Sequence, residues 1–476
     1  MKNTKLISLL KTFSKEEIKR FRDFVVSPYF NKNKNIQKLN DVLFRFHPNY
    51  DTQLPQEEEI FKEVFPGEKF DYFKFRNVSS DLYNLGLNFL RLTPNHNTEF
   101  TSEYNLIIQL RQRKLFNLHG KLVKSLEKQF KEKKIKDNVF LYSNYLVATE
   151  SQFVDLFEKP SSISGILNEF ESYFEYSINN LLFYYNLLIH IGKENNVQPE
   201  VKMMKEVTAF LSEGPVSSHP VALSYQYLIL LKTRNKEDYF FRLKEHYFNN
   251  FAYMDDFSAY TVHMYMFGYC ADKYNIAGDR RFIKEGYELY RHSYVNNRVT
   301  SGELLYPDFV NFIKVFVRAG DLELAQNFIK DYRDKLPADQ IDNCLNFSYA
   351  YISHFGGDLE NALKHISKVN FPLAILKVQV KIMEIQLNYQ LSYFEETRNL
   401  VESFKRTLAK EVIVSEDYKS SITGFLKHTV TLINLKQETN TKKRKLDSQM
   451  LAGSVNSTQP NHFGIRFWLE DRLKEI

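Results

Sequence analysis

Positive charge is the chemical feature that stands out in this sequence. The segment 111–136 carries ten basic residues against two acidic ones. Five of its lysines recur at spacings of seven, three, four and three residues: Lys114, Lys121, Lys124, Lys128 and Lys131. On a helix these spacings place the ammonium groups along one side, where they would attract nucleic acid phosphates, an anionic membrane surface or an acidic protein. A helix face that only contacts water has the same pattern, and aromatic residues for base stacking are missing from it.

Residues that could catalyse a reaction do not form a recognisable motif. The twelve histidines are scattered, and the sequence contains no H-E-x-x-H, no G-x-S-x-G and no phosphate-binding glycine loop. Cys270 and Cys344 lie within apolar helical patterns, which is typical of small core residues. We therefore expect no catalysis, no cofactor and no metal site. An enzyme whose site is assembled from distant residues is kept as a third hypothesis.

Composition predicts a large helical protein whose N-terminal part is basic. Of the 476 residues, 43% are hydrophobic and 26% charged, while 16 Gly and 13 Pro leave room for long regular elements. Residues 1–136 contain 26 Lys and Arg against 16 Asp and Glu, and the remainder contains 38 against 42. No apolar run approaches eighteen residues, and the apolar stretch near the start lacks a cleavage site, so we expect a cytoplasmic protein without a membrane span.

The first part of the chain predicts a compact helical domain over 1–98. Ser14 and Glu17 have the spacing of a capping box, and Ser27-Pro28 ends the helix that follows. Asp71 is a suitable N-cap for a further helix, whose apolar residues recur at spacings of three and four: Phe75, Val78, Leu82, Leu85, Phe89 and Leu92. This continuous row of apolar residues indicates that the helix packs against other helices rather than binding DNA bases as a recognition helix.

The clearest internal repeat lies in the second half of the chain. The segments 319–329 and 356–366 share a Gly-Asp-Leu-Glu-x-Ala core 37 residues apart. Weaker echoes place Tyr393 35 residues after Asp358, and Gly286 39 residues before Ala325. Such spacing is typical of stacked helical hairpins. A small residue after the Gly-Asp turn lets a neighbouring helix approach closely.

These spacings resemble the tetratricopeptide (TPR) family over about residues 280–410. Ala325 stands at the small second-helix position of that family, Pro337 falls where a repeat ends, and the large first-helix positions hold Phe309, Phe312 and Phe316. Asn346 departs from the pattern, because an aromatic residue is usual there. The resemblance implies an α-α superhelix, a solenoid of helical hairpins with a concave groove that binds a peptide or protein.

The expected organisation is all-α: a helical domain over 1–98, a TPR-like repeat region over 99–435, a flexible polar linker over 436–462 and a capping helix over 463–476. The linker carries a basic run at 442–445. The leading hypothesis for function is a non-catalytic interaction or scaffold protein that binds a protein or peptide partner of unknown identity in the groove. The alternative is a nucleic-acid-associated regulator that uses the basic region 1–136.

Overall fold

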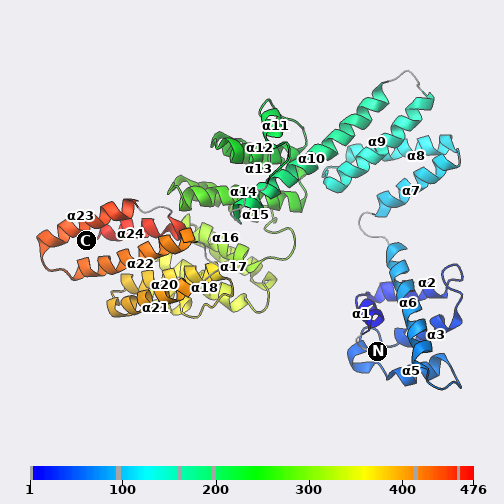
Figure 1. Ribbon diagram of the computed structural model, residues 1–476, viewed down its shortest axis with the longest axis horizontal. Coiled ribbons are helices and arrows are strands. Elements are labelled where there is room, and N and C mark those ends of the chain that lie inside the picture. The colour runs from blue at the N-terminus through cyan, green and yellow to red at the C-terminus, as the bar shows by residue number, and fades with distance from the viewer. Residues whose placement is uncertain (1–3, 93–97, 159–162, 195–199, 411–415, 458–460) are drawn as a thin grey trace. The chain divides into compact units, whose positions relative to one another are not determined.

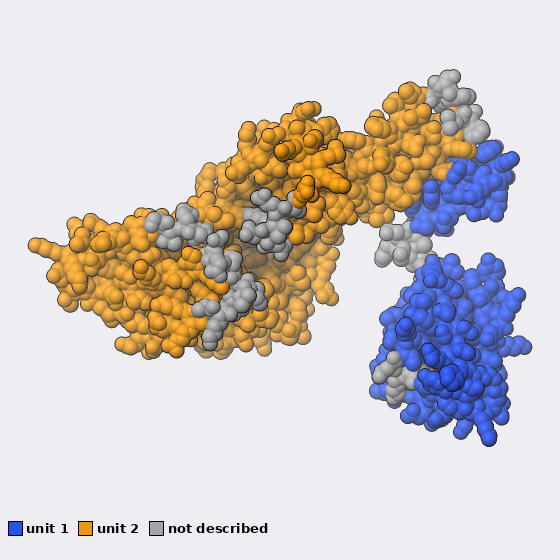
Figure 2. Space-filling model, in the orientation of Figure 1, with its two compact units in different colours: residues 1–119 blue, residues 120–476 orange. Residues whose placement is uncertain are grey.

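The chain is helical in every regular element that the structure describes. The computed structural model describes residues 4–92, 98–158, 163–194, 200–410, 416–457 and 461–476, and within these ranges it contains α-helices and short 3₁₀ turns but no β-strand. This confirms the predicted all-α class. Contacts divide the chain into two compact units, residues 1–119 and 120–476 (Figure 2).

The first unit is built from short helices around one long one (Figure 1). Its helices are α1 (Lys5–Lys11), α2 (Lys15–Val26), α3 (Lys34–Phe44), α4 (Tyr50–Gln53), α5 (Glu57–Val64), α6 (Tyr72–Leu92) and α7 (Thr98–Gln112). Its buried core comes from residues 6–89. The core therefore ends close to the predicted domain boundary at residue 98, whereas the division between the units lies later, because α7 is grouped with the first unit.

Local sequence explains the helix ends in the first unit. The Ser14 side chain accepts from the Glu17 amide at 3.1 Å and the Glu17 carboxylate accepts from the Ser14 amide at 2.8 Å, which is the predicted capping box. Asp71 accepts from the Lys74 amide at 3.0 Å and so caps α6. Phe75, Val78, Leu82 and Phe89 are buried on the α6 face that packs against α1, α2 and α3, whereas Leu92 is exposed. The long helix thus holds the unit together.

The second unit continues with longer helices. They are α8 (Phe116–Glu132, which begins just before the unit boundary), α9 (Asn138–Glu158), α10 (Ser164–Glu194), α11 (Met204–Leu211), α12 (Pro220–Arg234), α13 (Asp238–Asn250), η1 (Phe251–Tyr253), α14 (Asp256–Asn275), α15 (Arg281–Val295), α16 (Tyr306–Arg318), α17 (Leu322–Tyr332), η2 (Arg333–Lys335), α18 (Ile341–Phe355), α19 (Leu359–Ile366), α20 (Ala374–Gln390), α21 (Phe394–Lys410), α22 (Glu416–Gln437), α23 (Thr441–Ser457), η3 (His462–Gly464) and α24 (Ile465–Leu473).

From α12 to α21 the helices pack as successive hairpins (Figure 1). Each helix contacts the next one in the chain, and the first helices of neighbouring pairs also meet, α12 with α14 and α16 with α18. Short turns between the helices of a pair make this arrangement the simplest way to bury their apolar faces. The row of pairs positions the site described below.

The repeated Gly-Asp turns fold alike. Gly320 and Gly357 both have a φ of +87°, which glycine adopts without a steric penalty. The aspartate after each glycine caps the next helix, Asp321 accepting from the Leu324 amide at 2.9 Å and Asp358 from the Asn361 amide at 3.1 Å. The alanines that follow, Ala325 and Ala362, are completely buried. The small residues therefore lie at helix contacts, as predicted.

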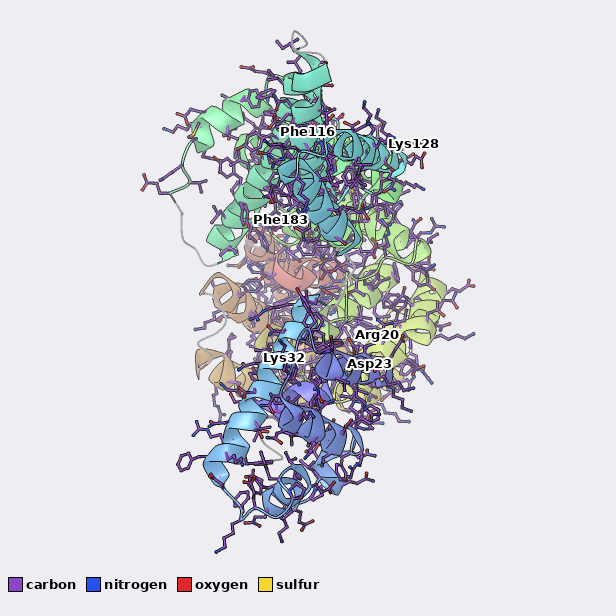
Figure 3. The ribbon with its side chains drawn as sticks, turned by 90° about the vertical axis from the view of Figure 1, so that its right-hand side faces the viewer. Arg20, Asp23, Lys32, Phe116, Lys128 and Phe183 are labelled. Atoms are coloured by element: carbon purple, nitrogen blue, oxygen red, sulfur yellow. The ribbon has the colours of Figure 1, made fainter. Side chains whose placement is uncertain are left out.

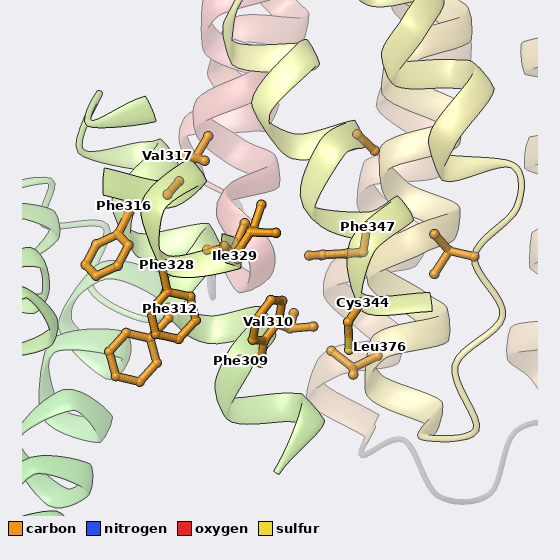
Figure 4. Close-up of a cluster of buried hydrophobic side chains, with 14 of the residues drawn as sticks. Phe309, Val310, Phe312, Phe316, Val317, Phe328, Ile329, Cys344, Phe347 and Leu376 are labelled. Carbon is orange, nitrogen blue, oxygen red and sulfur yellow. The ribbon is translucent and has the colours of Figure 1, made fainter. Parts of the chain in front are cut away.

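Aromatic side chains fill the core between these hairpins (Figure 4). Phe312 and Phe328 stack with their ring centroids 4.6 Å apart, and Phe309 and Phe316 are completely buried beside them. Each such ring stabilises the fold by roughly 1.5–3 kcal/mol relative to an exposed ring. Cys344, which lies in the same cluster, is a buried core residue.

The C-terminal part differs from the prediction. The range 436–462, predicted as a flexible linker, contains the helix α23, which packs against α22 and α24 through the buried Leu451 and Val455. Two buried residues in a mostly polar helix do not make a strong periodic pattern, which is why the sequence suggested a linker. The basic run 442–445 forms the first turn of α23. The predicted helix over 463–476 is present as α24.

Candidate binding pocket

The five lysines predicted to lie along one side of a helix, here called the lysine stripe, lie mostly on α8. Lys121, Lys124, Lys128 and Lys131 are all exposed along this helix, and Lys128 points away from it in Figure 3. Lys114 precedes α8 and has a φ of +59°, so it does not continue the helical row. The stripe is therefore a row of four lysines on α8, with Lys114 outside it.

The leucines at the start of this segment are not part of the buried side of α8. Leu115 and Leu118 are 45% and 52% exposed, whereas His119, Val123 and Leu126 are buried. Lys114 has a left-handed backbone, which separates α7 from α8, and α8 begins at Phe116. Residues before and after Lys114 therefore do not lie on one continuous helix face.

A pocket of about 290 Å³ lies in the second unit, between the first helices of successive hairpins and the C-terminal helix. The first helices α14, α16, α18 and α20 all contribute to its walls, and α24 and η3 close one side. Its side chains are of five kinds: the arginines 280, 318 and 472, the amide and imidazole groups of Gln379, Gln386, Gln390 and His354, the single acid Asp471, the aliphatic chains of Ile283, Ile382 and Met383, and the aromatic rings of Tyr274, Tyr351, Phe355, Phe463, Phe467 and Trp468.

The C-terminal segment is held on this face by aromatic and polar contacts. The Trp468 ring packs edge-on against Tyr389 and Phe425, with centroids 5.3 Å and 5.7 Å apart, and its Nε1 donates to Gln390 Oε1 at 3.4 Å. The Arg318 guanidinium donates to the Phe463 carbonyl at 3.3 Å. A segment more than a hundred residues away in the chain thus forms one wall of the pocket.

Positive charge dominates the wall that α16 contributes, where Arg318 lines the cavity and Lys314 lies behind it, outside the lining residues. Lys314 and Arg318 lie one turn apart on α16, a spacing at which like charges repel each other. Lys314 Nζ donates to Gln379 Oε1 at 3.1 Å. Burial, together with the neighbouring Arg318, lowers the pKa of Lys314 to about 7. Burial also lowers the pKa of His354, with a further contribution from Arg472.

Acidic partners reach only the outer arginines of the pocket. Arg280 lies 3.6 Å from the Glu470 carboxylate and 3.9 Å from that of Asp471, and its guanidinium lies 4.2 Å from the Phe467 ring centre. Arg472 pairs with Glu475 at 2.7 Å. The pocket can therefore hold an anion through Arg318 and an apolar ring against its aromatic wall.

The cysteines are buried and the histidines are not gathered into a metal-binding cluster among the described residues. Burial raises the pKa of Cys344 to about 12 and raises that of Cys270 as well, so both thiols stay protonated at neutral pH. The described part of the chain holds no cluster of three or more His, Cys, Asp or Glu side chains with metal-binding geometry. It also has no helix with the length and apolar character of a membrane span.

Sequence reasoning did not find the pocket residues. Arg318 ends a run from Phe312 in which Lys314 is the other cation and the remaining residues are apolar, and this pattern is the signal that was available. The remaining walls come from positions between 274 and 472, which only the fold brings together. Searches with the whole chain against protein-family models, curated proteins and solved structures found no match.

Proposed function

We propose that this chain is a non-catalytic interaction protein whose hairpins form a TPR-like row and which binds a protein partner. The buried alanines, the left-handed glycines and the aspartate caps of α17 and α19 support the TPR-like interpretation. These features recur at the spacing that first suggested the family.

The predicted groove is already covered in part. The pocket walls show that the first helices α14, α16, α18 and α20 face one side, and α24 lies on that side. A peptide that bound along this groove would have to displace α24 and its contacts through Trp468. We therefore place the partner surface elsewhere in the second unit.

The observation that carries the proposal is an exposed apolar seam on α10. Its large apolar side chains recur at helical spacings of three and four, with Ser177 filling the one gap: Ile166, Phe170, Tyr173, Leu181, Tyr184 and Leu188. Phe170 is 60% exposed and Tyr184 57%. Exposed apolar surface of this extent marks interaction sites, and the heptad-like spacing fits the apolar face of a partner helix.

Site-specific cross-linking in the source cells tests this proposal. A photoreactive benzoylphenylalanine replaces Phe170 in one variant and Lys128 in a matched control, since both side chains are exposed on long helices. We expect one discrete protein adduct from position 170 and none from position 128. Absence of an adduct at position 170 at normal expression levels would contradict the proposal.

Nucleic acid binding is the second candidate, because the lysines of α8 are exposed. Within the part of the chain that the structure describes, Lys121, Lys128 and Lys131 make no ion pair, so their charge is available to phosphates. Binding of the full chain to random DNA or RNA would fall steeply with salt. Loss of that binding in Lys121→Glu with Lys128→Glu would favour this candidate.

A further inference from the structure

Two cations in the second unit lack an acidic partner. Among the described residues neither Lys314 nor Arg318 forms an ion pair with an acidic side chain. Lys314 donates to the Gln379 side chain, and Arg318 donates to the Phe463 carbonyl and to the neutral Tyr351 side chain. Both side chains are mostly withdrawn from water. Placing two like charges side by side away from water is destabilising unless an anion compensates them.

The rest of the pocket does not supply that anion. Glu470 and Asp471 face Arg280, and Glu475 faces Arg472. Asp471 also pairs with Lys474 at 2.7 Å, so its charge is directed outward. The inner cations thus keep an excess of positive charge.

Two further groups are ready to contact a ligand. Arg472 Nε is buried in the pocket wall without a hydrogen-bond partner among the described residues. The Gln386 amide lies in the wall, and no described residue hydrogen-bonds to it. A buried unpaired donor is costly and is usually satisfied by a ligand or water. Together with Arg318 these groups converge on one cavity.

The remaining walls favour a flat apolar ring. Tyr274, Phe355, Phe463 and Phe467 surround the cavity, and Arg280 already lies over the Phe467 ring. Rings bind other rings and guanidinium groups by offset stacking. A cavity of about 290 Å³ has room for one small molecule rather than a peptide segment.

We propose that this pocket binds a small organic anion that carries a planar ring, of the size of a nucleoside monophosphate. Its phosphate or carboxylate group binds Arg318, with Lys314 adding positive charge behind it. Gln386 and Arg472 hydrogen-bond to the ligand, and its ring lies against the aromatic wall. Because α24 forms one wall, the bound anion also fastens the C-terminal helix to α16. This site is independent of the partner surface proposed on α10.

Isothermal titration calorimetry on the full chain tests the proposal with matched probes. Purine and pyrimidine 5′-monophosphates supply charge and ring, adenosine supplies the ring alone, and inorganic phosphate supplies the charge alone. Indole-3-acetate replaces the phosphate group with a carboxylate. We expect a monophosphate or indole-3-acetate to bind at least tenfold more tightly than adenosine or phosphate. Which of the two binds identifies the anionic group.

Variants locate the binding site. Arg318→Gln is expected to weaken binding at least tenfold, and Arg318→Lys is expected to restore part of it. Arg242→Gln, at an exposed ion pair on α13, serves as the control and is expected to bind like the wild type.

Circular dichroism checks that each variant is folded. If Arg318→Gln does not fold, the change in Trp468 fluorescence on adding the probe to the wild type replaces it, because Trp468 lines the pocket and is the only tryptophan. The proposal is overturned if no ring-bearing anion binds at millimolar concentration or if adenosine or phosphate binds equally well. It is also overturned if a folded Arg318→Gln binds like the wild type, or else if binding leaves the Trp468 fluorescence unchanged.

Discussion

Single glycines set the geometry of the hairpin turns. Gly357 has a φ of +87°, and open space surrounds the position that a Cβ would occupy, so only backbone strain opposes a side chain there. We expect Gly357→Ala to lower the free energy of unfolding by about 1–2 kcal/mol, measured by urea denaturation. Gly268→Ala is the control, because Gly268 also has open space but lies within α14. It should stabilise the chain by roughly 0.5–1 kcal/mol. Equal effects of the two changes would contradict a left-handed requirement at residue 357.

Lys314 should make stability depend on pH. Its pKa in the folded chain, about 7, lies below the ordinary value of 10.5. Between these pH values the unfolded chain binds more protons than the folded chain, so stability rises with pH across that window. His354, whose pKa is also lowered, contributes a similar rise at lower pH.

Lys314→Met isolates this contribution. The free energy of unfolding of the wild type minus that of the variant should increase between pH 7 and pH 9, by at most about 1.4 kcal/mol per unit. Urea denaturation at several pH values measures it. A difference that stays constant with pH would show that Lys314 keeps its ordinary pKa.

Some buried residues of the second unit could be predicted from the sequence, whereas the residues of the pocket could not. The buried alanines were predictable, because one hairpin repeats the pattern of another. Arg318 and Arg472 were not, since each looks like an ordinary surface arginine in its own helix. Their place in one pocket depends on how α16 and α24 are brought together by the fold, and no local pattern encodes that arrangement.

The helix α24 is an element whose docking can be measured directly. Trp468 is the only tryptophan of the chain, so its fluorescence reports on this helix alone. Its ring packs against Tyr389 and Phe425. We expect Trp468→Phe to retain most of the stability and Trp468→Ala to lose about 2–4 kcal/mol, because the ring is partly buried. Urea denaturation followed by circular dichroism compares the variants.

The wild-type fluorescence provides the control for that prediction. If α24 is docked, the Trp468 emission should shift to longer wavelength in the same urea transition that circular dichroism reports. Emission typical of exposed tryptophan in the absence of urea would show that α24 is not docked on this face.

Helices with strong end signals were predictable, and those without them were not. The ends of α2 and α6 follow from Ser14, Glu17 and Asp71, whose side chains cap the backbone as their spacing indicated. The helix α23 was missed because only its packing against α22 and α24 favours it over a polar linker. Tertiary contacts, rather than local preference, decide such a segment.

At the scale of the whole molecule, the helix class and the succession of hairpins were predictable, since both depend on short-range periodicity. The surfaces left for binding were not. The helix α24 and the first helices α14, α16, α18 and α20 line one pocket, whereas the seam on α10 is exposed. Which faces stay uncovered depends on how all the helices of a unit pack, and this cannot be derived one helix at a time.

The native mass of the chain in extracts of its source cells tests the central claim, that the chain works by binding a protein through α10. The wild type should run as a complex heavier than the 56.5 kDa monomer. Phe170→Glu with Tyr184→Glu should reduce it to the monomer without unfolding it, because charges on the seam exclude a partner's apolar face. Lys121→Glu with Lys128→Glu should leave the complex intact. A monomeric wild type, or a complex that survives the α10 changes and is lost with the α8 changes, would contradict the claim.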